Sequence, residues 1–163
     1  MTEVPATIKA VLIDVDGVLT DGSFWWGVNG EEFKRFYFAD TTGISRALKA
    51  GIRIGLVSGE SNEAGMKLVQ RLADKLQITD TYKGCHDKAA AVREFAQKHA
   101  LALSELCFIG DDWIDAPAME IVGLAVAPAD AQPPARAKAH IITKATGGNG
   151  AVREVLDALM SSK

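Results

Sequence analysis

The sequence predicts a doubly wound α/β domain, in which helices cover both faces of a parallel sheet. Short apolar runs, rich in aliphatic and β-branched residues, alternate with longer amphipathic segments along most of the chain. This alternation is typical of strands that are buried on both faces and connected by helices. Polar residues follow the carboxyl ends of the main runs, where ligands bind in sheets of this kind. We therefore expect the functional site at that edge of the sheet.

Five apolar runs predict the main strands, and a weaker strand is expected in TDTYKG at 79–84. The five runs are IKAVLID at 8–14, IRIGLVSG at 52–59, ELCFIGDD at 105–112, GLAVA at 123–127 and HIIT at 140–143. Helices are expected over 41–50, 61–77, 87–99, 112–121, 131–138 and 150–161. Gly51 is a suitable helix stop and Asp87 a suitable helix start, because glycine tolerates the left-handed conformation and aspartate caps free N–H groups.

Residues 20–39 interrupt the alternation. TDGSFWWGVNGEEFKRFYF predicts two strands joined by the Asn29-Gly30 turn, a strong hairpin signal. Because the hairpin follows the loop after the first strand, it is placed to stand over the site as a flap. The alternative is a hairpin that only completes a core or an interface.

Length and composition limit the function classes. A chain of 163 residues suits one domain, which we expect to span 1–163. A net charge of -3 gives no positive field for nucleic acid or an anionic membrane, and no apolar run reaches bilayer length. The N-terminus lacks a signal-peptide pattern, and two cysteines form no framework. We therefore expect a cytoplasmic protein with no nucleic-acid or membrane partner.

Asp14 and Asp16 are the strongest chemical signal. Side chains two residues apart on an extended backbone point the same way, so both carboxylates should face one place at a strand end. Like charges there need a cation, and Mg²⁺ prefers oxygen ligands. An aspartate can also attack phosphorus, while a second acid handles the proton. Taken alone, the pair could be a solvated acidic turn.

Three further strand or helix ends add polar residues. Ser58 and Gly59 follow the second main strand, where a hydroxyl and backbone N–H groups suit a phosphate. Lys88, beside the predicted cap, can place a positive charge on a phosphate oxygen. Singly, the first feature is a common turn and the second a common surface lysine.

The segment GDDWID adds three carboxylates after another strand. Gly110 permits close backbone approach, and Asp111 can complete a metal site. Asp112 and Asp115 can support that site. The alternative is a helix start whose first turn carries favourable negative charge.

Together, the motifs DVDGVLT, VSG, DK and GDDWID resemble those of the haloacid dehalogenase superfamily of phosphatases. The resemblance implies a Rossmann-type haloacid dehalogenase-like fold and phosphoryl transfer by positioning and charge neutralisation. It implies that Asp14 is the nucleophile and Asp16 the general acid and base, and that Ser58, Gly59 and Lys88 bind the phosphate. It further implies that Mg²⁺ is held by Asp14, by Asp111 and by the backbone carbonyl of Asp16, with Asp112 and Asp115 as supporting residues.

The resemblance extends to the capless branch that includes 3-deoxy-D-manno-octulosonate 8-phosphate phosphatase. The stretches DVDGVLTDG, GDDWIDAPAM, VGLAVAPADA and GGNGAVRE carry it, and the length leaves no room for a cap domain. It implies a homotetramer in which a neighbouring subunit closes each site, and a role in lipopolysaccharide biosynthesis. The runner-up is a non-catalytic oligomerisation module, as in the C-terminal domains of some N-acylneuraminate cytidylyltransferases.

Two departures leave the sugar acid open. GDDWID is close to the octulosonate pattern, but the octulosonate enzymes commonly have Ser-Gly-Arg where this chain has Ser58-Gly59-Glu60, and Arg-Asp-Gly where it has Ala39-Asp40-Thr41-Thr42-Gly43. Both departures resemble 2-keto-3-deoxynononate 9-phosphate phosphatase. Arginine can bind a carboxylate with two hydrogen bonds, and glutamate cannot. We therefore expect Glu60 to influence the choice between an eight-carbon and a nine-carbon substrate.

Two features have alternative interpretations. Lys67, Arg71 and Lys75 form a basic stripe on the second helix, which is either solvated or reaches the substrate carboxylate or Glu60. The stretch at 147–150 either closes a neighbouring site or is a flexible loop before a docking helix.

Overall fold

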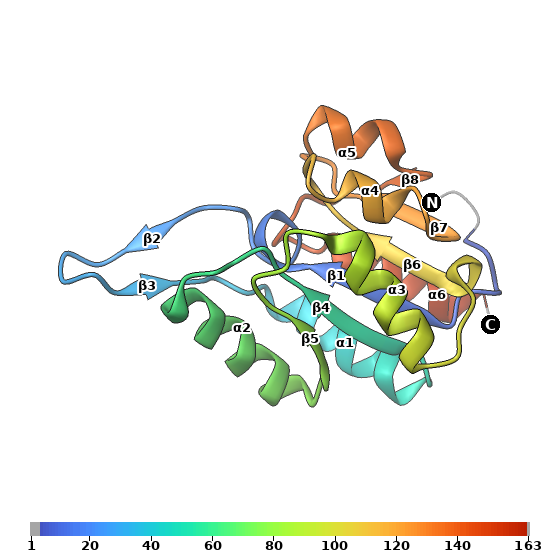
Figure 1. The fold of residues 1–163 in the computed structure, drawn as a ribbon, viewed down its shortest axis with the longest axis horizontal. Helices are drawn as coiled ribbons and strands as arrows, with labels where there is room; N and C mark the ends of the chain where they lie inside the picture. The colour runs from blue at the N-terminus through green and yellow to red at the C-terminus, as the bar shows by residue number, and fades with distance from the viewer. Residues whose placement is uncertain (1–3, 163) are drawn as a thin grey trace.

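The computed structural model describes residues 4–162 and contains a six-stranded parallel sheet of order β5-β4-β1-β6-β7-β8 (Figure 1). The strands are β1 (Ala10–Asp14), β4 (Arg53–Val57), β5 (Asp80–Tyr82), β6 (Leu106–Ile109), β7 (Leu124–Ala127) and β8 (Ile141–Ile142). The chain runs outward from β1 in one direction and then returns to continue on its other side through β6. The strand order therefore reverses beside β1, where sheets of this class bind ligands. The predicted doubly wound sheet is confirmed, including the weaker strand, now β5.

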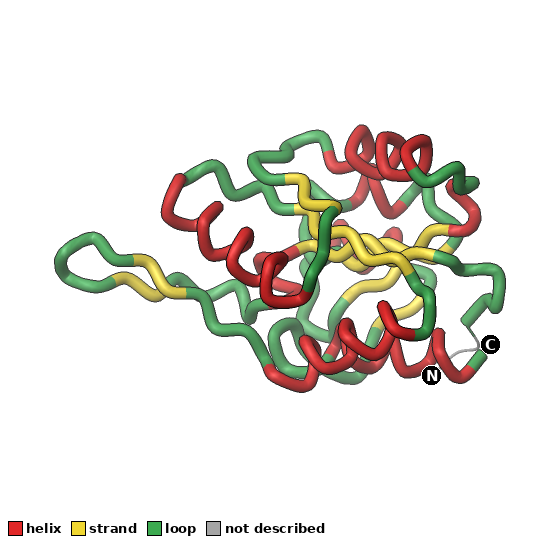
Figure 2. The backbone as a smooth tube through the Cα atoms, turned by 90° about the horizontal axis from the view of Figure 1, so that it is seen from below, coloured by secondary structure: helices red, strands yellow, loops and turns green. Residues whose placement is uncertain are grey.

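Helices lie on both sides of the strands (Figure 2). They are α1 (Phe38–Lys49), α2 (Glu63–Leu76), α3 (Lys88–Lys98), α4 (Ala116–Met119), α5 (Pro133–Lys138) and α6 (Ala151–Ser161). Alternate residues of β1 enter two separate apolar clusters: Val11 and Ile13 join the cluster with α1, α2 and α6, and Leu12 joins the one with α3 and α4. Burial on both faces fixes β1 as the central support of the site. Within residues 4–162, no helix combines the length and apolar character that crossing a membrane requires.

Two predicted helix boundaries are wrong, each for a local reason. Helix α1 begins at Phe38 rather than at 41, because the Thr41 N–H already donates to the Tyr37 carbonyl at 3.3 Å. The hydroxyls of Thr41 and Thr42 also donate to the Phe38 carbonyl, at 2.9 and 3.0 Å, within this first turn. Helix α4 covers four residues rather than 112–121. There the Asp115 carboxylate accepts hydrogen bonds from the backbone N–H groups of Asp111 and Asp112, and this segment forms a turn.

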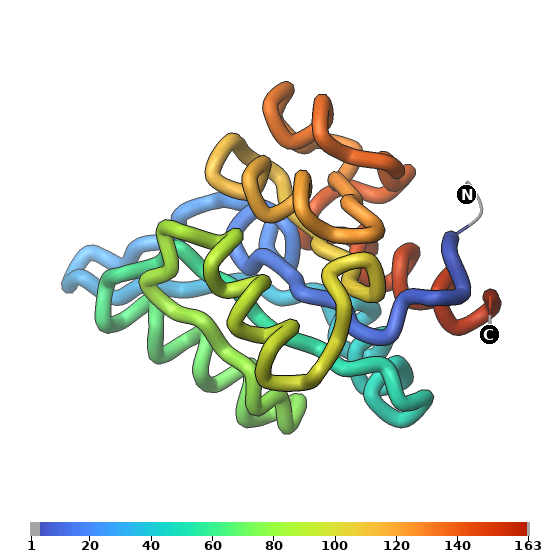
Figure 3. The backbone as a smooth tube through the Cα atoms, turned by 45° about the vertical axis from the view of Figure 1, so that its right-hand side comes forward, coloured from blue at the N-terminus to red at the C-terminus, as the bar shows by residue number. Residues whose placement is uncertain are grey.

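The hairpin of β2 (Trp25–Trp26) and β3 (Glu32–Phe33) is confirmed and projects from the body of the molecule (Figure 1). It lies alongside α2 (Figure 3). Its connection differs from the two-residue turn that was predicted: the Gly27 N–H donates to the Glu31 carbonyl at 2.8 Å, so the turn spans 27–31 and contains Asn29-Gly30. Each strand covers two residues, and aromatic side chains near the tip are exposed.

Candidate active site

The floor of the site is a buried ion-pair cluster at the ends of β1, β6 and α3. The Lys88 ammonium donates hydrogen bonds to Asp14 Oδ1 at 2.7 Å and to Asp115 Oδ1 at 2.6 Å. Asp14 ends β1, Lys88 begins α3, and Asp115 follows β6. No side chain of this group exposes more than 5% of its surface. The structure thus brings together three residues that lie far apart in the sequence.

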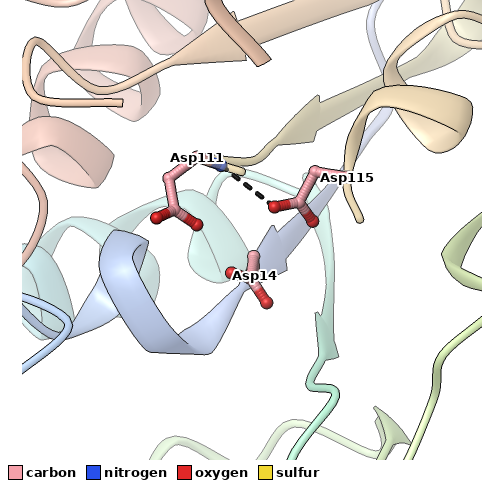
Figure 4. Close-up of side chains that lie close together, drawn as sticks. All are labelled: Asp14, Asp111 and Asp115. Carbon is pink, nitrogen blue, oxygen red and sulfur yellow. Dashed lines mark hydrogen bonds between the residues drawn. The ribbon is translucent and has the colours of Figure 1, made fainter. Parts of the chain in front are cut away.

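Asp111 adds a third carboxylate to this floor (Figure 4). One carboxylate oxygen from each of Asp14, Asp111 and Asp115 lies within 4.8 Å of the others. Burial raises the pKa of Asp14 well above its ordinary value, and the Asp115 charge adds to this. Burial, and next the charge of Asp115, raise the pKa of Asp111 to about 6. One ammonium does not neutralise three carboxylates, and a set of oxygen ligands of this charge fits a hard divalent cation.

Hydrogen bonding distinguishes the three carboxylates. Asp115 uses Oδ1 for Lys88 and Oδ2 for the N–H groups of Asp111 and Asp112, at 3.1 Å each. Among residues 4–162, no N–H group or ammonium donates to Asp14 Oδ2 or to either carboxylate oxygen of Asp111. The two oxygens of Asp115 are therefore committed to the scaffold. Asp14 and Asp111 keep oxygens that are free to reach a ligand.

A tight loop after β1 fits closely against Asp111. The Thr20 N–H donates to the Val15 carbonyl at 3.0 Å and closes the loop. Gly17 within it has a φ of 91°, and a Cβ at this position would overlap the Asp111 carboxylate. Only glycine combines this conformation with this approach. The sequence contained this signal in DVDG, although Gly17 was not singled out as a site residue.

The glycine stretch at 147–150 packs on the same loop of its own chain. The Gly148 N–H donates to the Val18 carbonyl at 2.9 Å, and a Cβ at Gly147 would overlap the Gly17 carbonyl. Asp40, at the start of α1, accepts from the N–H groups of Gly150 and Arg153 at 3.1 and 2.8 Å. The stretch therefore links the N-terminus of α6 to the Asp14 loop.

Ser58 and Gly59 lie at the end of β4. Ser58 is buried, and its hydroxyl accepts a hydrogen bond from the Glu60 N–H at 3.1 Å. Gly59 lines a pocket of about 190 Å³. The other lining residues are Asp14, Asp16, Glu60, Lys88, Asp111, Asp112 and Ile114. All four of the sequence motifs therefore contribute to one edge of the sheet.

Lys34, on the hairpin, was missed by the sequence reasoning. Its ammonium donates to Asp16 Oδ1 at 2.5 Å and also lies 3.5 Å from Glu60 Oε2 and 3.8 Å from Glu32 Oε1. The Lys34 side chain is 7% exposed, whereas that of Asp16 is 40% exposed. A weak signal was present, because residues 32 and 34 share one face of an extended chain. The Asp16 carboxylate thus turns to the hairpin rather than joining the floor cluster.

The predicted basic stripe divides in two. Lys67 pairs with Glu63 at 2.6 Å and is 75% exposed. Arg71 and Lys75 instead line, together with Lys34, a cavity of about 360 Å³ between α2, the hairpin base and α1. All three side chains are exposed, as the solvated interpretation predicts, and Arg71 and Lys75 also line the cavity beside the hairpin.

Comparisons with known proteins agree with this geometry. A family model described as haloacid dehalogenase-like hydrolase matches residues 60–156. The chain is 42% identical over 153 residues to 3-deoxy-D-manno-octulosonate 8-phosphate phosphatase of Escherichia coli K12, covering 94% of this chain and 79% of that protein.

Solved structures are similar over nearly the whole chain. The crystal structure of the octulosonate phosphatase from Yersinia pestis is 39% identical with a TM-score of 0.91, covering 96% of this chain and 83% of that one. The enzyme from Moraxella catarrhalis, in complex with magnesium, phosphate and the sugar acid KDO, is 34% identical with a TM-score of 0.91, covering 97% and 88%.

Proposed function

Because this chain belongs to the haloacid dehalogenase-like hydrolases and is a phosphoric monoester hydrolase, we propose that it removes phosphate from a 2-keto-3-deoxy sugar acid phosphate with Asp14 as nucleophile. The observation that carries this proposal is the state of Asp14. Lys88 holds its Oδ1 at 2.7 Å, and no N–H group or ammonium within residues 4–162 donates to its Oδ2. One carboxylate oxygen of Asp14 lies within 4.8 Å of one from Asp111. An anchored carboxylate with one available oxygen is suited to in-line attack on phosphorus.

The other residues would act around that attack. Asp14, Asp111 and the backbone carbonyl of Asp16 would hold Mg²⁺, which neutralises charge on the transferred group when bound. Ser58, Gly59 and Lys88 would orient the phosphoryl oxygens. Asp16 would give its proton to the departing alcohol and then take one from the water that hydrolyses the acyl phosphate.

Asp115 and Asp112 would support this arrangement without meeting the substrate. Asp115 holds Lys88 and the backbone of the 111–112 turn. The Asp112 carboxylate accepts from the Trp113 N–H at 2.6 Å at the rim of the pocket. Both contacts fix the loop that carries Asp111, so the support is directed at the metal position.

The eight-carbon substrate is our first choice, because it is the one named for the relatives above. A nine-carbon substrate is the second candidate, and Glu60 favours it. Glu60 Oε2 lies 3.5 Å from Lys34, and its Oε1 accepts from the Asn62 N–H at 2.8 Å. A carboxylate fixed in this way at the pocket wall would accept hydrogen bonds from sugar hydroxyls and would repel a substrate carboxylate.

The test is phosphate release from both sugar acid phosphates, with and without Mg²⁺. We expect Mg²⁺-dependent release from at least one of them, and a change in the ratio of the two kcat/KM values in Glu60→Arg. Glu63→Arg, at an exposed position on α2, is the control and should leave the ratio unchanged. No release from either compound would contradict the proposal and favour the non-catalytic module.

The assembly state is a further part of the proposal. The hairpin exposes Phe24, Trp26 and Val28, which are apolar side chains near one tip. Exposed apolar groups that cluster in this way are typical of interaction sites. We propose that a homotetramer covers them. A cytoplasmic location and the lack of nucleic-acid and membrane partners stay predictions from the sequence.

A further inference from the structure

We infer that Lys34 is a positioning residue that orients the Asp16 carboxylate for proton transfer to the leaving group. The inference rests on the proposed function and concerns a residue of the hairpin rather than of the four motifs. Lys34 donates to Asp16 Oδ1 at 2.5 Å, and within residues 4–162 this is the one hydrogen bond that the Asp16 carboxylate makes. Without it, a side chain that is 40% exposed would have no hydrogen bond or ion pair within residues 4–162 to fix its rotamer.

The surroundings of Lys34 restrict where its ammonium can lie. Glu60 and Glu32 flank it at 3.5 and 3.8 Å, and the side chain is 7% exposed. These two carboxylates hold the ammonium from the wall of the pocket and from the hairpin, while Asp16 takes the shortest contact. Lys34 therefore connects the hairpin to the tight loop after β1 at one defined atom, Asp16 Oδ1.

This contact leaves Asp16 Oδ2 for the substrate. As the bond from Asp14 to phosphorus forms, the bond from phosphorus to the bridging oxygen breaks, and the proton on Asp16 moves to that oxygen to give the alcohol. Asp16 becomes a carboxylate in this step, and the Lys34 ammonium stabilises the developing negative charge without giving up a proton. In the second step a water loses a proton to Asp16 and attacks the acyl phosphate, which releases phosphate and restores both aspartates.

The dependence on the leaving group distinguishes this role from a structural one. An alkoxide needs protonation as it departs, whereas p-nitrophenolate leaves without it. The parameter kcat/KM reports the steps up to departure of the alcohol, so it excludes the later hydrolysis in which Asp16 acts as a base. The variants are Lys34→Met, which keeps the length without the charge, and Lys34→Arg, which keeps a donor.

We expect Lys34→Met to lower kcat/KM for the sugar acid phosphate about 100-fold, within the range for loss of a positioned general acid. For p-nitrophenyl phosphate, or acetyl phosphate if the aryl ester reacts too slowly, we expect a change of less than about fivefold, because the required proton transfer is absent. Lys34→Arg should recover part of the loss for the sugar acid phosphate alone. Lys67→Met is the control: Lys67 lies on α2, is exposed and pairs with Glu63. This variant should change kcat/KM for neither substrate.

Equal losses for both substrate classes, or no loss for the sugar acid phosphate, would overturn the inference. If Lys34→Met does not fold, Lys34→Arg and Lys34→Gln carry the same comparison between substrates. Wild-type protein that releases phosphate from no substrate would contradict the proposed function itself. That outcome differs from the one that overturns only the inference, in which the wild type is active and Lys34→Met does not alter the dependence on the leaving group.

Discussion

The floor of the site and the hairpin beside it each contain a lysine that binds aspartate, two aspartates in the floor and one at the hairpin, but in different environments. Lys88 is buried between Asp14 and Asp115 on elements of the central sheet. Lys34 reaches the half-exposed Asp16 from a hairpin that projects from the body. The floor is fixed by burial and hydrogen bonds within one chain. The hairpin contact instead depends on where a projecting segment is held, so we expect changes there to affect catalysis more than stability.

Replacing Lys88 should give the largest effect on stability. Lys88→Met leaves Asp14 and Asp115 buried without their cation, and breaking a buried pair in this way costs about 3–5 kcal/mol. Lys34→Met should cost about 1 kcal/mol, because water can reach Asp16. Urea unfolding in EDTA measures both. Equal losses would show that the two environments do not differ as described.

Binding of Mg²⁺ should stabilise the floor by the next largest amount. A ligand at 100 times its Kd adds about 2.7 kcal/mol to the free energy of unfolding. Thermal unfolding with increasing Mg²⁺ should therefore show a rising Tm in the wild type and little rise in Asp111→Asn. Glu32→Gln, on the hairpin, is the control and should retain the wild-type response. A rise that survives in Asp111→Asn would place the metal elsewhere.

Two glycines with positive φ provide a smaller and closely matched comparison. Gly17 and Gly30 have φ values of 91° and 87°, and placing a side chain in this conformation costs about 1–2 kcal/mol at either position. A Cβ at Gly17 would also displace Asp111, whereas nothing lies within 4 Å of one at Gly30. Gly17→Ala should therefore abolish the Mg²⁺-dependent rise in Tm, and Gly30→Ala should keep it. Loss of the rise in both variants would contradict the assignment of this loop to the metal position.

The hairpin tip should have the smallest effect on the stability of the single chain. Phe24→Ser combined with Trp26→Ser removes exposed apolar surface and leaves the core intact. We expect a shift from tetramer toward monomer in sedimentation experiments, with far-UV circular dichroism unchanged. Ile142→Ser, at an exposed position in β8, is the control. A double variant that stays fully tetrameric would exclude the tip from the interface.

Much of the fold could be predicted from the sequence, because the buried strands are apolar runs with polar residues at their ends. The failures have local causes in side chains. Asp115 accepts backbone N–H groups and turns a predicted helix start into a loop, and Thr41 joins α1 through its N–H and its hydroxyl. Such competition between side chain and backbone leaves no periodic signal.

The floor of the site was likewise predictable, because each motif follows a strand or begins a helix at one edge of the sheet. What sequence reasoning did not supply was the division of labour among the carboxylates. Both oxygens of Asp115 accept hydrogen bonds, from Lys88 and from the N–H groups of Asp111 and Asp112. These bonds depend on the turn that residues 111–115 form. Lys34 was missed because its partner Asp16 lies 18 residues away, across a hairpin whose docking no local pattern specifies.

In the proposed mechanism Asp14 carries the phosphoryl group during turnover, and this species can be trapped. The enzyme is mixed with Mg²⁺ and the sugar acid phosphate, quenched in acid within one turnover, and digested for mass spectrometry. We predict a phosphoryl group on Asp14 in the wild type and none in Asp14→Asn, which should also release no phosphate. Wild-type turnover without a labelled Asp14, or a label on Asp16 instead, would contradict the account.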